Sequence, residues 1–520
     1  MKVLSVAEMQ AVEKQADKSG ISYQSMMQHA GQGVAAWVAN NLSTERGVLG
    51  LVGSGNNGGD TLIALTDLAA RGIRTIAFLI KDRPDDEDIL RDYIEAGGQT
   101  VDLSDGEHIE LLRCALFPGT VLLDGVLGTG LKLPLRGQLA GLMAEIKEIV
   151  ANCSETVVVA VDCPSGVDCD TGEAAEQTLR ASHTLVMAAV KQGLLRHPAR
   201  DLTGAFHGID IGIGPITNYI QDIMPTMLDT PWVRARLPER PENGHKGTFG
   251  ACMVIAGSPA YTGAAYLAGM GAYRGGCGLV HMVVMPAVRQ SLAGAFVEGI
   301  WTVLPEHKGQ FSPDAIRELT PKLSSADSLI VGPGWGISPQ NKTFLAHLLE
   351  AIPADLPTLF DADGIKLLAE IPNWWEKVPE QTILTPHPGE MAVLSGLSVA
   401  EIQAERWSIA KEYAGKWGIV LLLKGALSVI AGPDGQRLIN PVSDSALAKA
   451  GSGDVLSGVI GGLLAQGRLD VTNAAGIGVW VHGMAGLVAK QRIGSAASVT
   501  ARDILESIGE GFKQTEADAK

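Results

Sequence analysis

Ala448-Lys-Ala-Gly-Ser-Gly-Asp454 is followed at once by an apolar run over residues 455–464. This order predicts a glycine-rich turn that opens a buried helix. The free backbone N–H groups of such a turn point outward, and the helix dipole adds positive potential there. The segment therefore predicts an anion site at the start of a helix.

Asp454 places a carboxylate at this predicted anion site. A turn that only bound phosphate would not carry a group that repels it. The carboxylate is explained if Asp454 removes a proton from a hydroxyl group while the amides of residues 451–453 stabilise a transferring phosphoryl group. The segment thus predicts phosphoryl chemistry on an alcohol, with Asp454 as the base.

The bulk composition excludes several classes of protein. A chain of 520 residues, 46% of them hydrophobic, predicts two or three globular domains. The formal net charge of −16 disfavours binding to nucleic acid or to an anionic membrane. The six cysteines form no CxxC pair and the N-terminus lacks the apolar core of a signal peptide, so we expect reduced thiols and a cytoplasmic location. We find no uncharged apolar run of about 18 residues and expect no membrane span.

Apolar strands and helices alternate along both halves of the chain. Two amphipathic helices are expected within residues 1–45, and a linker is expected over the proline-rich stretch 216–240. Pro433-Asp-Gly predicts a hairpin. The alternation predicts two α/β domains, each a sheet between two layers of helices, the first of them Rossmann-like. The expected strands lie at 50–52, 75–80, 121–123, 157–161 and 185–188, and then at 252–256, 280–284, 329–331, 358–360, 382–384 and 420–423.

Three polar loops follow expected strands in the first half. Gly53-Ser-Gly-Asn-Asn-Gly-Gly-Asp60 fits G-x-G-x-x-G, with Asp82 after the next strand, and is either a dinucleotide fingerprint or a structural turn. The loop over residues 124–134 combines backbone amides, a hydroxyl and Lys132, which suits a phosphate. Asp162-Cys-Pro-Ser165 puts a carboxylate and a hydroxyl at a strand end. Hard oxygen ligands for an alkali or alkaline-earth cation are supplied by Asn57, Asp124 and Ser165.

In this order the three loops resemble the YjeF N-terminal domain, the NAD(P)HX epimerase family, over roughly residues 1–215. The resemblance implies a potassium ion at Asn57, Asp124 and Ser165, and acid/base work for Asp162. It also implies which residues hold the hydrated nucleotide, namely Asn56, Asn57, Gly58, Gly59, Asp60, Gly128, Thr129, Gly130, Leu131, Lys132, Leu133, Pro134 and Asp162.

The second half carries four further polar segments ahead of the turn at 451–454. They are Gly257-Ser-Pro-Ala-Tyr-Thr-Gly, Gly332-Pro-Gly-Trp-Gly336, Thr385-Pro-His-Pro-Gly-Glu390 and Lys424-Gly-Ala-Leu-Ser428. Their small residues allow close backbone approach to a ligand, and His387 is held between two prolines. The ordered segments resemble the YjeF C-terminal domain over roughly residues 228–510. That family is the NAD(P)HX dehydratases, which have a ribokinase-like fold.

This second resemblance implies an adenine nucleotide, ADP in bacterial members, with Mg²⁺. The nucleotide would be bound by Lys424, Gly425, Ala426, Leu427, Ser428 and Gly453. The hydrated cofactor would contact Ala265, Gly334, His387 and Asp454. Family members usually carry Gly-Asn where this chain has Ser443-Asp444. We expect Asp444 to weaken nucleotide binding or to recruit Mg²⁺.

Together the two halves resemble the bacterial bifunctional NAD(P)H-hydrate repair family. The resemblance implies that NADHX and NADPHX are epimerised by the first domain and dehydrated by the second, with ADP converted to AMP and phosphate. A homo-oligomer is expected. Three other functions are open at this point. They are a kinase of a small alcohol, a hydride-transfer enzyme using the loop at 53–58, and a nucleotide-binding protein without catalysis.

Overall fold

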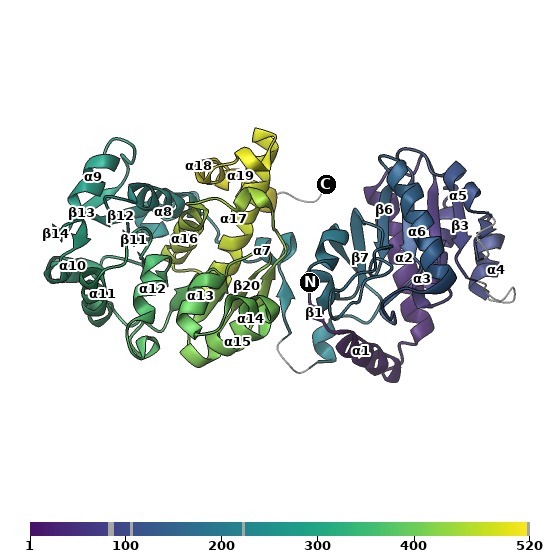
Figure 1. The fold of residues 1–520 in the computed structure, drawn as a ribbon, viewed down its shortest axis with the longest axis horizontal. Helices are drawn as coiled ribbons and strands as arrows, with labels where there is room; N and C mark the ends of the chain where they lie inside the picture. The colour runs from purple at the N-terminus through teal and green to yellow at the C-terminus, as the bar shows by residue number, and fades with distance from the viewer. Residues whose placement is uncertain (82–87, 105–107, 221–223, 517–520) are drawn as a thin grey trace. The chain divides into compact units, whose positions relative to one another are not determined.

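The computed structural model describes residues 1–81, 88–104, 108–220 and 224–516. Asp82, the expected acidic residue after the second strand, lies outside them. The chain divides into an N-terminal unit, Met1–Met224, and a C-terminal unit, Pro225–Lys520. Both are built of helices and mostly parallel strands (Figure 1). The predicted α/β fold class is confirmed.

The N-terminal unit contains a seven-stranded parallel sheet within its described residues. Its five inner strands are mostly buried apolar runs, which need helices on both faces, while the two edge strands are more exposed. Helices α1–α4 pack in the apolar core on one face, and α5 and α6 form a second core on the other. The sheet order is β4 (Gln99–Asp102), β3 (Thr75–Leu79), β2 (Val48–Val52), β5 (Val121–Gly125), β6 (Val157–Val161), β7 (His183–Met187) and β9 (Ala205–Ile209). The helices are α1 (Val6–Lys18), α2 (Tyr23–Asn41), α3 (Asn56–Ala70), α4 (Asp88–Glu95), α5 (Ile109–Ala115) and α6 (Gly137–Asn152).

The first two helices and the expected strands of this unit are confirmed. Strand order reverses between β2 and β5, because the chain runs from β2 to one edge of the sheet and returns beside β2. Ligands of open α/β sheets bind at such a point, beyond the carboxyl ends of the strands. The two loops there touch. Asn57 Nδ2 donates to the carbonyl of Leu127 over 3.0 Å, and a Cβ on Gly53 would lie 1.9 Å from the carbonyl oxygen of Val126. A short pair, β1 (Val3–Leu4) with β8 (Val190–Lys191), runs in parallel outside the main sheet.

The C-terminal unit contains a ten-stranded sheet whose strands are parallel except around β20. The hairpin of β20 and β21 confirms the prediction from Pro433-Asp-Gly. The order is β10 (Thr226–Met227), β21 (Arg437–Asn440), β20 (Ser428–Ala431), β19 (Val420–Leu423), β18 (Thr382–Leu384), β17 (Thr358–Phe360), β16 (Ser328–Val331), β11 (Ala251–Ile255), β12 (Leu279–Val284) and β13 (Ile300–Val303). A hairpin of β14 (Glu306–His307) and β15 (Gln310–Phe311) is separate.

Helices cover both faces of this sheet (Figure 1). One layer is α8 (Thr262–Gly275), α16 (Ser452–Ala465) and α17 (Val471–Ile493), and the other includes α11 (Pro339–Ala351), α12 (Asp363–Ala369), α13 (Pro388–Ser395) and α15 (Arg406–Trp417). The remaining helices are α7 (Thr230–Arg234), α9 (Pro286–Leu292), α10 (Ile316–Leu323), α14 (Val399–Ala404), α18 (Ala501–Glu506) and α19 (Ile508–Glu516). Strand order reverses between β11 and β16, where the amide of Gly257 donates to the carbonyl of Pro333 over 2.7 Å.

Helix α17 corrects one expectation from the sequence. It spans 23 residues and is long and apolar enough to cross a membrane by length and composition. Its apolar window is 72% buried inside the structure, and the helix packs against α16 and α19. This burial is that of a core helix. The apolar run that we did not find in the sequence therefore exists, and it fills the interior of the C-terminal unit.

Candidate functional site

A cavity of about 830 Å³ opens in the C-terminal unit at the carboxyl ends of β17, β18 and β19. Each strand delivers one polar residue to it: Asp361 after β17, His387 after β18 and Lys424 after β19. The first turn of α16 forms another wall and carries Asp454. The predicted site residues that line this cavity are His387, Lys424, Gly425, Ala426, Ser428, Gly453 and Asp454.

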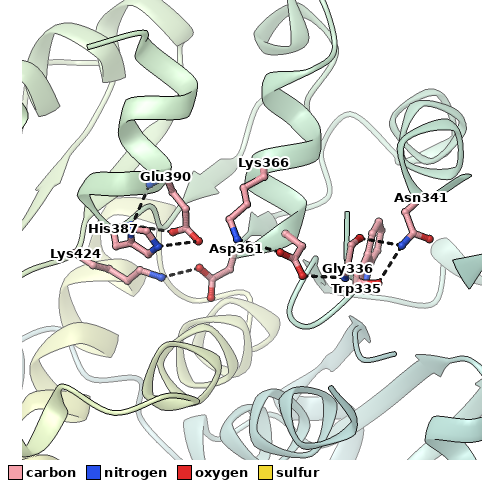
Figure 2. Close-up of polar contacts among 9 residues, drawn as sticks. Trp335, Gly336, Asn341, Asp361, Lys366, His387, Glu390 and Lys424 are labelled. Atoms are coloured by element: carbon pink, nitrogen blue, oxygen red, sulfur yellow. Dashed lines mark hydrogen bonds and ion pairs between the residues drawn. The ribbon is translucent and has the colours of Figure 1, made fainter. Parts of the chain in front are cut away.

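Lys424 and Asp361 form a buried ion pair in this cavity, with 2.8 Å between Lys424 Nζ and Asp361 Oδ1 (Figure 2). The Asp361 side chain is 1% exposed, and its other oxygen accepts a 2.6 Å hydrogen bond from Ser457 Oγ. Burial opposes ionisation of Asp361, but Lys424 and these hydrogen bonds outweigh it and leave the pKa of Asp361 below its ordinary value. The pair is therefore charged. Sequence reasoning did not predict this pairing.

Asp454 shares the cavity with this pair, yet its carboxyl group makes no hydrogen bond or ion pair with the part of the chain that the structure describes. Burial, and then the negative charge of Asp361, raise the pKa of Asp454 to about 7, against the opposing pull of Lys424. A carboxyl group with a pKa near neutrality can act as a general base on a hydroxyl group.

His387 is fixed by the start of α13. Its Nδ1 accepts hydrogen bonds from the amides of Gly389 (3.0 Å) and Glu390 (3.2 Å), while the carboxylate of Glu390 accepts from the amide of His387 (3.0 Å). The proton of the neutral ring therefore sits on Nε2. Figure 2 shows His387 and Glu390 beside Lys424. This Nε2 lies 3.5 Å from Glu390 Oε1, so the imidazole faces that carboxylate at the cavity wall.

The loop over residues 332–336 is held rigidly at the reversal of strand order. Asn341 Nδ2 donates to the carbonyls of Trp335 and Gly336, each over 3.0 Å, and the amide of Gly336 donates to Asp363 Oδ2 over 2.9 Å (Figure 2). Gly334 has φ +66°, and a Cβ there would meet Ala264 and Tyr261. Of the predicted residues, Gly334, Ala265 and Leu427 do not line the 830 Å³ cavity.

Asp444 lines the cavity but is already paired. Lys490 Nζ lies 2.7 Å from Asp444 Oδ2, and Asp444 Oδ1 accepts a hydrogen bond from the amide of Ala446 over 2.9 Å. Although burial opposes it, these partners leave the pKa of Asp444 below its ordinary value. The extra carboxylate is therefore ionised and matched by a lysine, so that the pair adds no net charge to the cavity wall.

Two buried residues that the sequence did not indicate support the walls. Arg406 Nη2 donates to the carbonyls of Leu423, Lys424 and Leu427 over 3.0, 3.1 and 3.2 Å, which fixes the loop at 424–428 from below. His482 Nε2 lies 3.1 Å from Ser452 Oγ, and burial lowers its pKa to about 4, so the ring is neutral. The sequence around Arg406 and His482 carries no motif that indicates these roles, because the residues that they contact lie far away along the chain.

The N-terminal unit has a cavity of about 570 Å³ walled by α1, α2, α3 and the strand ends. The predicted residues that line it are Asn56, Asn57, Asp60, Gly128, Thr129 and Asp162. The others do not line it. Gly58 and Gly59 are buried in α3, Lys132 is exposed, and Gly130, Leu131, Leu133 and Pro134 lie along the following loop.

Lys191 is the main residue of this cavity that sequence reasoning missed. Its side chain is 2% exposed and forms an ion pair with Asp162. Asp162 Oδ1 also accepts from the amide of Met187 over 2.9 Å, and Asp162 itself has φ +62°. A single lysine within the apolar stretch 184–195 was the available signal. Glu13, from α1, also lines the cavity and was missed.

The predicted cation ligands come together behind this cavity. Asp124 Oδ2 accepts from the amide of Ser165 over 2.9 Å, and Ser165 Oγ accepts from the amide of Leu127 over 2.9 Å. The buried Asn57 Oδ1 and Asp124 Oδ1 have no hydrogen-bond donor among the described residues. Orphaned buried oxygens are costly without a partner, and a hard cation is one that they suit.

Two family descriptions match the chain. Residues 252–510 match the family described as NAD(P)H-hydrate dehydratase, and residues 23–193 match the YjeF-related protein N-terminus. The chain is 37% identical over 490 residues to the bifunctional NAD(P)H-hydrate repair enzyme of Moorella thermoacetica, covering 92% of this chain and 91% of that one. It is 33% identical over 491 residues to the enzyme of that name in Escherichia coli, covering 92% and 88%. The ADP/ATP-dependent NAD(P)H-hydrate dehydratase structure from Bacillus subtilis, co-crystallised with ATP and Mg²⁺, aligns with a TM-score of 0.47 and 31% identity over 56% of this chain and 99% of that one.

Substituting Lys424 by Met tests the buried ion pair. Because the Asp361 charge would lose its buried partner, we expect the free energy of unfolding of the C-terminal unit to fall by about 3–5 kcal/mol. Urea unfolding followed by tryptophan fluorescence reports on this unit, since every tryptophan except Trp37 lies in it. The exposed Lys411→Met is the control, and adding Asp361→Asn to Lys424→Met should restore part of the loss. Equal effects of Lys424→Met and Lys411→Met would contradict the pairing.

Proposed function

Since the chain belongs to the family of bifunctional NAD(P)H-hydrate repair enzymes, we propose that its two cavities are the two active sites of that repair. The N-terminal unit interconverts R- and S-NAD(P)HX. The C-terminal unit dehydrates S-NAD(P)HX to NAD(P)H at the expense of ADP or ATP. The observation that carries the assignment of the second site is Asp454, a buried carboxyl group without a protein partner at an anion-binding turn.

In the C-terminal site we assign Asp454 as the base that takes the proton from the hydroxyl group of the hydrate. The free amides at the start of α16 stabilise the transferring phosphoryl group, and Lys424 and Ser428 hold the nucleotide phosphates. Phosphate then leaves the hydrated carbon with the bonding electron pair, the neighbouring ring carbon loses a proton to water, and the ring double bond forms again. We propose ADP as the donor, giving AMP, because the resemblance is to bacterial members of the family.

Mg²⁺ would enter this site on the nucleotide phosphates, where it neutralises charge. The described residues contain no group of three or more His, Cys, Asp or Glu side chains placed to hold a metal. A site with only one or two protein carboxylates suits Mg²⁺, because proteins often bind this ion through one or two carboxylates plus substrate phosphates. Asp444 is not available for this role while Lys490 holds it. The other carboxyl groups that line the cavity are those of Asp361, Glu390 and Asp454.

In the N-terminal site we assign acid/base work to Asp162, which forms an ion pair with the buried Lys191. A potassium ion would be held by Asn57, Asp124 and Ser165. Asn57 Oδ1 and Asp124 Oδ1, which are buried and have no hydrogen-bond donor among the described residues, support this assignment. The ion would fix the loops after β2 and β5 and supply positive charge near an anionic substrate.

We also propose domain limits of 1–215 and 228–510 for the two activities. A cytoplasmic location is supported by six cysteines that are all free thiols, and the homo-oligomer stays a prediction.

Recovery of absorbance at 340 nm from mixed R- and S-NADHX tests the function. With Mg²⁺, K⁺ and ADP we expect complete recovery, because the R form must be converted before it is dehydrated. ATP and no nucleotide serve as comparisons. Recovery that stops at the S fraction would remove the epimerase assignment. A stable phosphorylated product without absorbance at 340 nm would identify a kinase of a small alcohol.

Asp454→Asn should lower ADP-dependent dehydration of S-NADHX by at least about 100-fold, because the base is lost. Conversion of R- to S-NADHX should be unchanged. In the wild type, kcat/KM for dehydration should rise as pH increases through about 7, since only ionised Asp454 accepts a proton. The exposed Asp355→Asn is the matched control. Dehydration that persists in Asp454→Asn would exclude this residue as the base.

Potassium should stabilise the N-terminal unit more than sodium does. A ligand that binds only the folded state at 100 times its Kd adds about 2.7 kcal/mol. We expect K⁺ to slow hydrogen exchange in peptides from β2 and β5, and Asp124→Asn to abolish the difference between K⁺ and Na⁺. Asp201→Asn, at an exposed pair with His197, is the control. An undiminished K⁺ effect in Asp124→Asn would contradict the assigned ligands.

A further inference from the structure

We propose that Asp60 is the second catalytic acid/base residue of the N-terminal site and works as a pair with Asp162. The proposal rests on the epimerase function assigned above and goes beyond the substrate contact that resemblance implies for Asp60. Epimerisation must open and re-form a bond on two faces of one carbon. A site for it needs two proton-transferring groups that reach the ring from different walls.

The placement of Asp60 meets this need. It lies in the first turns of α3, is 8% exposed and lines the same cavity as Asp162, which reaches the cavity from the loop after β6. Its carboxyl group has no hydrogen bond or ion pair with any residue that the structure describes. Asp162, by contrast, is engaged by Lys191 and by the amide of Met187. A buried, unpartnered carboxyl group aimed into a ligand cavity calls for a role in the chemistry.

The two carboxyl groups have different electrostatic surroundings in the cavity. Burial first, then the charges of Asp162 and Glu13, raise the pKa of Asp60 well above its ordinary value, against Lys191. Burial also raises the pKa of Glu13. Lys191 is the one cation lining this cavity among the described residues, and it is taken by Asp162. Asp60 therefore keeps its proton to higher pH than an ordinary aspartate does, while Asp162 is paired with Lys191.

Other charged and titratable groups on the packed elements lie outside this arrangement. Asp124 on β5 is fully buried behind the cavity, and Tyr23 on α2 lines the cavity mouth. The remaining charged groups on the neighbouring helices do not line the cavity, namely Glu8, Lys14, Asp17 and Lys18 on α1, His29 on α2, Asp67 on α3, and Asp88, Arg91, Asp92 and Glu95 on α4.

The reaction balances with these two groups and water. Asp60 gives its proton to the hydroxyl oxygen as the bond from the hydrated carbon to that oxygen breaks, and water leaves with the electron pair. The adjacent ring nitrogen donates its lone pair and becomes an iminium. A second water adds to the opposite face of the carbon and gives its proton to Asp162. One water leaves and one enters, nothing is oxidised, and the reverse direction exchanges the roles of the two aspartates.

Glu13 is assigned as a positioning residue that keeps the proton on Asp60. It comes from α1, which precedes the residues 23–193 that match the epimerase-type family description. Its carboxylate acts on Asp60 through charge alone, since no hydrogen bond joins the two in the described structure. Removing that charge should make Asp60 a stronger acid and leave substrate contacts in place.

The test follows purified R-NADHX in H₂¹⁸O, with conversion to the S form read by chiral separation and mass. Wild type should gain one ¹⁸O per inversion. Asp60→Asn should lower kcat for inversion at least about 100-fold with little change in KM. Asp67→Asn, on the same helix but paired with Arg71 outside the cavity, should behave as wild type. Inversion at the wild-type rate in Asp60→Asn, or inversion without ¹⁸O uptake, would overturn the proposal.

Glu13→Gln supplies an independent readout that does not depend on the folding of Asp60→Asn. Asp60 must be protonated to act as the acid, so activity is lost as pH rises through its pKa. Glu13→Gln should move that alkaline limb of the kcat profile to lower pH, and an unmoved limb would contradict the proposal. A wild-type protein that inverts neither epimer would instead remove the epimerase function itself.

Discussion

In each cavity one lysine is paired with an aspartate, and further carboxyl groups line the same cavity. Lys424 is paired with Asp361 and Lys191 with Asp162, while Asp454 and Asp60 form no ion pair with the described residues. In a poorly solvated site, a second negative charge beside the first is costly, so the unpaired group keeps its proton to higher pH. The fold thereby places, in each cavity, a carboxyl group with a raised pKa beside one that is paired with a lysine.

Parallel sheets explain why these residues meet. Every buried parallel strand ends at the same edge of its sheet, so Asp361, His387 and Lys424 are neighbours although they lie far apart in the chain. The reversals of strand order, between β2 and β5 and between β11 and β16, separate the loops and open room for a ligand. Close backbone approach holds the loops there, as at Gly53 against Val126 and Gly257 against Pro333.

The sequence predicted the strands, the hairpin and the α/β class because continuous apolar runs and glycine turns are local signals. It also placed Asp454, His387 and Lys424 in what proved to be one cavity. It did not predict the ion pairs of Lys191 or Lys424, nor Arg406 below the loop at 424–428, because a pairing between distant residues leaves no local pattern. The apolar run of α17, which we did not find in the sequence, shows a limit of composition. Composition alone does not distinguish a buried core helix from a membrane-spanning helix.

Asp444 shows how a distant pairing bears on the chemistry. Nucleotide phosphates bring further negative charge close to Asp454, whose pKa is already about 7, and each added charge favours its protonated, inactive form. An unmatched carboxylate at Asp444 would act in the same direction. Lys490 lies 2.7 Å from Asp444 and balances its charge, while Lys424 and the first turn of α16 line the same cavity. Replacing the family's usual Gly-Asn by Ser443-Asp444 is therefore compatible with an ionised base, because the compensating charge comes from α17.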